Sequence, residues 1–455
     1  MPRLSVVSAH TSPLEQPSTG DAGGMNVYLA AVLPELAALG WEVSVLTRGE
    51  GTERLADGVE VVGVPVPAGD KYALAAAAPA FARAAAGADV VHSHYWVSGL
   101  AGMLTGSPHV HSMHSNSLAK NVRLVPGDAR EPEERIRSEH EVLASADAVV
   151  VAGTAEYDDV VRGYGVDARK VTIAPPGVES RFRPGTEERP FEIVLVGRVQ
   201  PLKGQLLAVH ALARIPPGER PVLRLVGGPA PGREGYLAAV EEAARTLGVA
   251  GWVRFDGVGD RDATALRLRR ARLALVPSAA ETFGLIALEA AASGTPVLAR
   301  RTTGLVDAVS GGRSGVLIDS DDPGDWAAEI RRLLADDAER ATGSRRRRVG
   351  GGALVGVDGG AAGRGVPAAA RALTLSRRWR ARPGRAGRRW SSGTRARRSG
   401  ETATIAAPVK PASLPKRAGT ISVPMSRNRA NSSKTCAAAP PITNSCGESS
   451  ISRWR

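Results

Sequence analysis

Two cations follow a run of apolar residues in the segment "LVGRVQPLKG", which spans residues 195–204. The apolar run is typical of a buried strand, so we expect Arg198 and Lys203 in the loop at its carboxyl end. Arg presents a planar fork of N–H donors and Lys presents a point charge, and both suit the oxygens of a diphosphate. The alternative is that both are surface cations on an ordinary loop.

Two glutamates stand eight residues apart in "PSAAETFGLIALEAAASGTPV", residues 277–297. Glu281 is expected at a strand-to-helix junction, and Glu289 within a helix predicted over residues 284–293. Glu289 has oxygens that can accept hydrogen bonds from a ribose diol. An anion or a sugar hydroxyl could also bind the backbone N–H groups at the helix start, those of Phe283, Gly284 and Leu285. Taken singly, Glu281 is equally explained as an acid near a helix N-terminus, and Glu289 as an exposed charge on a helix.

A glycine pair precedes a predicted helix in "STGDAGGMNVYLAAVLPELAALG", residues 18–40. The helix is predicted over residues 25–39, directly after Gly23 and Gly24. Because these residues have no side chains, an anion could approach the backbone N–H groups at the helix start. A turn that favours glycine is the simpler explanation.

Five of the eight histidines fall within residues 92–114, in "HSHYWVSG" and "HVHSMHS". Because these segments close two predicted neighbouring strands, we expect their histidines to line a polar pocket. Zinc is the alternative, but no cysteine is near and no H-E-x-x-H sequence occurs, so we predict no metal site. The sequence also lacks a nucleophile elbow and a Ser-His-Asp arrangement.

Strands and helices alternate through residues 3–340, which predicts an α/β fold with parallel sheets covered by helices on both faces. A proline-rich stretch interrupts the pattern. We therefore predict two facing, doubly wound, Rossmann-like domains over residues 1–175 and 191–340, joined by a linker over residues 176–190. Ligands are expected at the carboxyl ends of the strands, between the domains. Apolar strand segments are predicted at 4–8, 41–47, 59–66, 88–94, 108–113, 147–153 and 170–175, and then at 191–197, 221–228, 252–257, 272–278 and 295–300.

The net charge of +13 comes from one end of the chain. Residues 341–455 hold 24 Lys and Arg residues against 3 acidic residues, which leaves 35 basic and 43 acidic residues in the first 340. This Arg-, Gly- and Ala-rich tail lacks periodicity, so we predict that it is disordered. A frameshift in a GC-rich gene is one explanation, and a genuine basic tail is the other. Both cysteines, Cys436 and Cys446, lie in this tail, so we expect no thiol chemistry before it.

The eight-residue spacing of Glu281 and Glu289, together with "GRVQPLKG", is similar to the signature of family 4 of the retaining nucleotide-sugar glycosyltransferases. The resemblance covers residues 3–340. The segments "HTSPLEQPSTGDAGGMNVY" and "HSHYWVSG", with "KN" at 120–121, resemble the family's mycothiol-pathway branch, the D-inositol-3-phosphate glycosyltransferases. The resemblance implies a GT-B arrangement of the two domains and front-face attack without a protein nucleophile, metal or cofactor. It also implies transfer of N-acetylglucosamine from a UDP-sugar to a cyclitol phosphate such as 1D-myo-inositol 3-phosphate.

The resemblance implies a role for each matching residue on the donor side. Gly23, Gly24, Arg198 and Lys203 would hold the donor diphosphate, and Glu289 would hold the nucleotide ribose. The donor sugar would be held by Glu281 and His114 together with the backbone of Phe283, Gly284 and Leu285. The catalytic residues implied are thus His114, Arg198, Lys203 and Glu281.

The sugar acceptor would be held by five residues from separate segments: Asn26, Lys71, Tyr95, Ser115 and Arg135. Ser115 stands where the family has Thr, and Ile136 stands where the family has a second Arg. The segments "VHSMHSNSLAKN" and "AGDKYALAAAAPAF" also depart from the mycothiol pattern. A glycosyltransferase for an aminocyclitol or sugar-thiol natural product is therefore the alternative. After residue 340 the family continues with helices that this sequence replaces by its basic tail, so an inactive remnant that binds only nucleotide is a further alternative.

We expect a cytoplasmic protein, because no signal peptide is evident and the alanine-rich stretch 73–91 is interrupted by Arg83 and Asp89. Its expected partners are a nucleotide sugar and a small-molecule sugar acceptor, and a homodimer is left open. Nucleic-acid binding is the alternative from another class, and only the basic tail supports it, so we do not expect a nucleic-acid partner.

Overall fold

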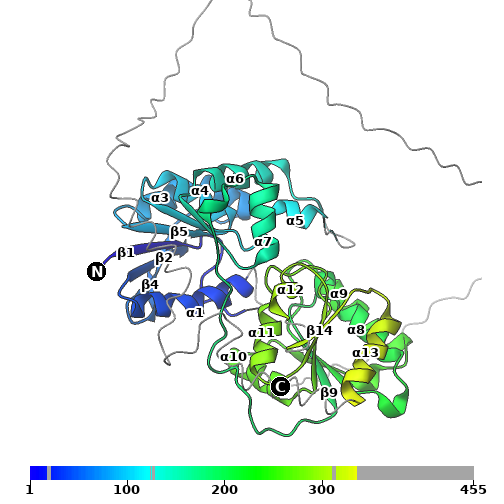
Figure 1. The fold of residues 1–455 in the computed structure, drawn as a ribbon. Coiled ribbons are helices and arrows are strands. Elements are labelled where there is room, and N and C mark those ends of the chain that lie inside the picture. The colour runs from blue at the N-terminus through cyan, green and yellow to red at the C-terminus, as the bar shows by residue number, and fades with distance from the viewer. Residues whose placement is uncertain (18–21, 123, 125–128, 310–313, 336–455) are drawn as a thin grey trace, which may run out of the picture. The chain divides into compact units, whose positions relative to one another are not determined.

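A computed structural model describes residues 1–17, 22–122, 124, 129–309 and 314–335. The predicted tail over residues 341–455 lies outside the described residues, as do residues 336–340 of the predicted second domain. Two sheets, each with helices on both faces, make up the described part of the chain (Figure 1). Within that part, no helix has both the length and the apolar content needed to cross a bilayer.

The first sheet has eight strands in the order β3-β4-β2-β1-β5-β6-β7-β8. All neighbouring pairs are parallel except β3 and β4. The antiparallel β3 was not predicted, although Asp57 and Gly58 form the two-residue connection that favours a hairpin, with Gly58 at φ 74°. The strands are β1 (Arg3–Val7), β2 (Glu42–Arg48), β3 (Thr52–Ala56), β4 (Val59–Val64), β5 (Val90–His94), β6 (His109–Ser112), β7 (Ala148–Val151) and β8 (Val171–Ile173).

Helices cover both faces of this sheet because its strands are apolar on both sides. Leu29, Leu33 and Leu36 of α1 pack on one face against Val6 and Val45. Phe81 and Trp96 pack on the other face, in the layer that holds α3 and α4. The helices are α1 (Gly24–Ala38), α2 (Lys71–Ala76), α3 (Ala78–Ala84), α4 (Trp96–Leu104), α5 (Ser117–Val122), α6 (Glu133–Ser145) and α7 (Thr154–Asp158).

The second sheet has six strands, all paired in parallel, in the order β11-β10-β9-β12-β13-β14. This is the doubly wound Rossmann order, in which the chain starts in the middle and winds outward in both directions. The edge strand β14 was not predicted. The strands are β9 (Glu192–Val196), β10 (Val222–Val226), β11 (Val253–Gly257), β12 (Leu273–Val276), β13 (Val297–Arg300) and β14 (Gly315–Ile318).

Two apolar clusters fill the faces of the second sheet, one around the fully buried Trp326 and Val209 and the other around Leu268 and Ala290. The predicted linker over residues 176–190 contributes Phe182 to the second cluster. The helices are α8 (Gln205–Ala213), α9 (Glu234–Thr246), α10 (Arg261–Arg270), α11 (Leu285–Ala292), α12 (Leu305–Ala308) and α13 (Pro323–Ala335).

Candidate functional site

The winding of each sheet reverses between two adjacent strands, β1 and β5 in the first sheet and β9 and β12 in the second. Connections from such a pair leave in opposite directions, which opens space at their carboxyl ends for a ligand. Arg198 and Lys203 follow β9, Glu281 follows β12 and Tyr95 follows β5. The topology therefore places these predicted site residues at the two reversal points.

Lys203 and Glu281 form an ion pair between the loops that follow β9 and β12. The pair is mostly buried, with side-chain exposures of 21% and 14%. Lys203 ends a 3-10 turn, and Gly204 follows it in the left-handed conformation at φ 73°. A Cβ at Gly204 would lie 2.7 Å from the backbone oxygen of Pro277, so glycine permits the two loops to approach. Two residues predicted to hold different parts of the donor are thus brought together.

The loop that carries Glu281 is tied to the neighbouring loop through Thr303. The backbone N–H of Glu281 donates to Thr303 Oγ1 at 3.0 Å, and the Glu281 carbonyl accepts from the Gly304 N–H at 3.0 Å. Thr303 has φ 28°, a backbone conformation that is costly for a residue with a side chain. Gly284 caps α11 at φ 80°, and Phe283 is buried beside it.

The predicted diphosphate glycines lie next to donor residues from the second sheet. A Cβ placed on Gly23 would lie 3.7 Å from Arg198 Nη2, and one placed on Gly24 would lie 3.7 Å from Leu285 Cδ1. Helix α1 begins at Gly24, as the glycine pair predicted. Four of the predicted donor residues therefore come from three separate segments to one place, where an anion would meet Arg198 and a helix start.

Glu289 is buried in α11 and paired with Arg261, whose Nη2 lies 2.6 Å from Glu289 Oε1. Arg261 also pairs with Glu179 at 2.5 Å, and its guanidinium lies over the Phe182 ring. Burial raises the pKa of Glu289, and the charge of Arg261 opposes that rise. Sequence reasoning did not predict Arg261, and the ribose role of Glu289 stays a prediction.

His114 follows β6 with φ 56°, a strained conformation for a residue with a side chain. Its Nε2 lies 2.7 Å from His94 Nδ1, and its carbonyl accepts from Thr282 Oγ1 at 2.6 Å. Burial, and then the charge of His10, lower the pKa of His114 to about 3. The ring is therefore neutral at pH 7 and can take part in hydrogen bonding without adding charge.

The other four clustered histidines lie inside the first domain. Each is at most 3% exposed, so they are packed in the interior and do not line an open pocket as we expected. Ser93 Oγ lies 2.6 Å from His109 Nε2 and 2.8 Å from His111 Nδ1, and Ser112 Oγ lies 3.0 Å from His92 Nε2. Within the described residues, no group of three or more His, Cys, Asp or Glu side chains is placed to hold a metal ion.

Three of the predicted acceptor residues meet around the Arg135 guanidinium. Arg135 Nη2 donates to Ser115 Oγ at 3.2 Å, and the guanidinium carbon lies 5.0 Å from the centre of the Tyr95 ring. Tyr95 has φ 72°, so the backbone is strained at this position as it is at His114. Arg135 itself is only 1% exposed. The structure thus brings together Tyr95, Ser115 and Arg135 from three elements of the first domain.

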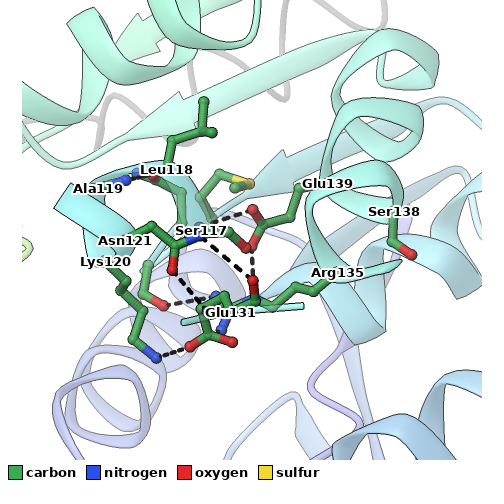
Figure 2. Close-up of polar contacts among 12 residues, drawn as sticks. Ser117, Leu118, Ala119, Lys120, Asn121, Glu131, Arg135, Ser138 and Glu139 are labelled. Carbon is green, nitrogen blue, oxygen red and sulfur yellow. Dashed lines mark hydrogen bonds and ion pairs between the residues drawn. The ribbon is translucent and has the colours of Figure 1, made fainter. Parts of the chain in front are cut away.

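Two carboxylates that sequence reasoning missed hold Arg135 (Figure 2). Glu139 Oε1 accepts from Arg135 Nε at 2.9 Å, and Glu131 Oε1 lies 2.8 Å from Arg135 Nη1. Glu139 also accepts from the Ser117 N–H at 2.9 Å and from the Tyr164 hydroxyl. The sequence did contain a signal for both, because Glu131 and Glu139 lie four residues before and four residues after Arg135. This spacing places both acids next to the Arg when they lie in the same helix or in the residues that lead into it.

The remaining two acceptor predictions have different surroundings. Asn26 is 1% exposed and braces the loop before α1, since its Oδ1 accepts from the Gly23 N–H at 2.9 Å. Its Nδ2 donates to Thr11 Oγ1 at 2.6 Å and to the Ser12 carbonyl at 2.5 Å. Lys71 opens α2, after Asp70 caps the helix. Acceptor roles for Asn26 and Lys71 stay predictions.

Two family models match consecutive parts of the chain. Residues 23–177 match the "Glycosyl transferase 4-like domain", and residues 178–349 match "Glycosyl transferases group 1". The boundary between the matches falls at the start of the predicted linker.

Curated relatives match over most of the chain. A D-inositol 3-phosphate glycosyltransferase from Acidothermus cellulolyticus is 40% identical over 369 residues, which cover 73% of this chain and 82% of the relative. One from Thermomonospora curvata is 38% identical over 381 residues, covering 74% and 88%.

Solved structures share the fold. A sucrose-phosphate synthase from Thermosynechococcus elongatus aligns with a TM-score of 0.72 at 27% identity, covering 84% of this chain and 98% of that one. HepE from Anabaena, in complex with UDP and glucose, aligns with a TM-score of 0.61 at 18% identity, covering 76% and 93%. The two-domain GT-B fold predicted from the sequence is thereby confirmed.

Proposed function

This chain belongs to the nucleotide-sugar glycosyltransferase family that includes the D-inositol 3-phosphate glycosyltransferases, and from that premise we propose that it glycosylates a cyclitol phosphate. The proposed donor is UDP-N-acetylglucosamine, the proposed sugar acceptor is 1D-myo-inositol 3-phosphate, and the proposed outcome is retention at the anomeric carbon. The observation that carries the acceptor class is the meeting of Arg135, Ser115 and Tyr95 beside the first reversal point.

The donor diphosphate is proposed to bind where Arg198, Lys203 and the start of α1 come together. A charged leaving group needs partners that are already in place as the negative charge develops. Lys203 is held by Glu281, and Arg198 approaches Gly23, which places no side chain between the guanidinium and the backbone. These cations and N–H groups supply the stabilisation without a protein nucleophile.

The sugar acceptor is proposed to bind through its phosphate to Arg135 and Lys71, with hydroxyls from Ser115 and Tyr95. A guanidinium favours a phosphate over a neutral sugar because its parallel N–H groups match phosphate oxygens. Arg135 is suited to this task because Glu139 fixes its Nε edge, Nη2 lies beside Ser115 and Nη1 pairs with the partly exposed Glu131.

The proposed transfer breaks the bond between the anomeric carbon and the donor phosphate oxygen. A bond from the cyclitol hydroxyl oxygen to the same carbon forms on the same face. The hydroxyl proton passes to an oxygen of the departing phosphate, so no protein base is consumed. His114 is neutral and contributes by hydrogen bonding on the donor side, not by proton removal at pH 7.

The proposal is tested by incubating the full chain with UDP-N-acetylglucosamine and either inositol 3-phosphate or free inositol, with product detection by mass spectrometry. We expect kcat/KM to be higher for the phosphorylated acceptor, and we expect Arg135→Lys to reduce that preference. Equal or better transfer to free inositol, or to an unphosphorylated aminocyclitol, would refute the acceptor class and favour the natural-product alternative.

A further inference from the structure

Glu131 is a carboxylate shared by two cations at the proposed acceptor site. Its Oε1 lies 2.8 Å from Arg135 Nη1 and also pairs with Lys120 Nζ. Figure 2 shows this carboxylate between the two basic side chains. A single acidic oxygen thus bridges Lys120 and Arg135, which is the arrangement that a phosphate oxygen would also adopt.

The two carboxylates around Arg135 differ in how firmly they are held. Glu139 is fully buried and accepts from three donors, the Ser117 N–H, the Tyr164 hydroxyl and Arg135 Nε. The Glu131 side chain is 15% exposed, and one of its two cations, Lys120, is 47% exposed. Displacing Glu139 from Arg135 would leave a fully buried carboxylate without its cation, whereas a displaced Glu131 can reach water.

The charges of this cluster already balance without a ligand, since Lys120 and Arg135 offset Glu131 and Glu139. Burial raises the pKa of Glu131, but hydrogen bonds and charge attraction from Lys120 and Arg135 outweigh burial and lower it overall. Glu131 therefore stays ionised near pH 7. An incoming phosphate meets cations that are already paired and has to compete with Glu131 for them.

We propose that Glu131 is a specificity-determining residue, an internal anion at the Lys120–Arg135 pair that a phosphorylated sugar acceptor displaces when it binds. The inference rests on the proposed acceptor class. A phosphate dianion carries enough charge to take the place of the carboxylate, whereas a neutral cyclitol hydroxyl does not. Glu131 thereby lowers the affinity for the phosphorylated acceptor. In return, it discriminates against ligands that cannot displace it.

Glu131→Gln tests the inference because glutamine keeps the shape and removes the charge. We expect KM for inositol 3-phosphate to fall about fivefold, the effect of about 1 kcal/mol of lost competition, while KM for the nucleotide sugar is unchanged. Glu133→Gln is the matched control: it removes the same charge at the start of α6 from an exposed side chain. An unchanged or raised KM for inositol 3-phosphate in Glu131→Gln would overturn the inference.

Thermal unfolding with added inorganic phosphate separates this inference from the proposed function. We expect phosphate to raise the midpoint temperature more in Glu131→Gln than in the wild type or in Glu133→Gln, since the cations no longer have an internal anion. Equal shifts in all three would also overturn the inference. If the wild type transfers no sugar to inositol 3-phosphate, the proposed function fails, and the phosphate measurement still decides the role of Glu131.

Discussion

The proposed donor and acceptor regions contain cations in different surroundings. On the donor side Lys203 and Arg198 come from the loop after β9, and the Lys203–Glu281 pair keeps 21% and 14% of its side chains exposed. On the acceptor side Arg135 is inside the domain at 1% exposure, between Glu131 and Glu139. The donor-side pair thus keeps some contact with solvent, whereas Arg135 is enclosed in the domain interior.

This difference separates catalysis from stability. Removal of a loop cation should reduce turnover and should lower the unfolding free energy less than removal of Arg135 does. Removal of Arg135 should reduce both, because Glu139 would remain buried without its cation. Substitutions on each side test this difference. If turnover and stability respond alike in both regions, the two regions do not differ as described.

Arg135→Ala is expected to have the largest effect. Breaking a buried ion pair by removing one partner costs about 3–5 kcal/mol, because the remaining charge is left uncompensated. We expect the unfolding free energy, measured with urea, to fall by about that amount. Arg137→Ala, an exposed position on the same helix, is the control and should stay close to the wild type. A loss below about 1 kcal/mol in Arg135→Ala would contradict the structural role of the buried pair.

Lys203→Ala should act on turnover. Loss of one group that stabilises the leaving diphosphate costs about 2–4 kcal/mol in the barrier, which steady-state kcat measures. We expect a smaller loss of thermal stability than in Arg135→Ala, since Lys203 and Glu281 are less buried than Arg135 and Glu139. Arg331→Ala, which removes an exposed cation from α13, should leave kcat unchanged. Near-normal turnover in Lys203→Ala would refute the proposal that Lys203 stabilises the donor diphosphate.

The donor region was the more predictable of the two from sequence. A buried strand followed by Arg198 and Lys203, and a glycine pair followed by a helix, are local patterns whose positions follow from strand-end geometry. The structure brings Gly23 beside Arg198 and Lys203 beside Glu281, as strand-end placement suggested. Both sheets were also predictable, because strand and helix periods alternate clearly over most of the chain.

The proposed acceptor region depends on long-range contacts as well as on the local spacing of Glu131 and Glu139 around Arg135. Glu139 is a buried carboxylate whose partners include Tyr164, 25 residues away, and a Glu in a charge-rich amphipathic helix normally indicates a solvated face. The four interior histidines were misjudged for the same reason. Serines on the neighbouring strand contact one ring nitrogen each of His92, His109 and His111, whereas His94 contacts His114, and only cross-strand register reveals these contacts. The edge strand β3 was missed because its segment TERLA has few apolar residues, whereas β14, GVLI, is apolar but only four residues long.

Measuring stability as a function of pH tests the first domain in particular, because that domain contains the interior histidines. Burial lowers the pKa of His92 and His114 to about 3 and that of His109 to about 4, so the folded state stays neutral while the unfolded state gains protons below 6.5. Each such histidine should cost about 1 kcal/mol of unfolding free energy between pH 6.5 and 5.5. Glu156 acts in the opposite direction, since burial raises its pKa to about 7 and the folded state binds its proton more tightly.

Three histidines outweigh one glutamate, so we expect stability to fall as the pH is lowered through this window. His109→Gln should reduce the fall, and His210→Gln, an exposed position on α8, should not. Urea unfolding at pH 6.5 and 5.5 provides the measurement. Equal losses in His109→Gln and the wild type would show that His109 takes up its proton in the folded state.

Metal removal should have the smallest effect. The donor diphosphate is proposed to be neutralised by Arg198, Lys203 and the backbone at the start of α1, so the leaving group has cationic partners from the chain itself. We therefore expect kcat to be the same with EDTA as with magnesium or manganese. The Lys203→Ala variant extends the test: if a divalent metal restores its turnover while the wild type is indifferent to EDTA, the metal replaces the missing charge and Lys203 is its functional equivalent. If EDTA abolishes wild-type turnover and a metal restores it, the chain's own cations are insufficient and this account of the leaving-group site is wrong.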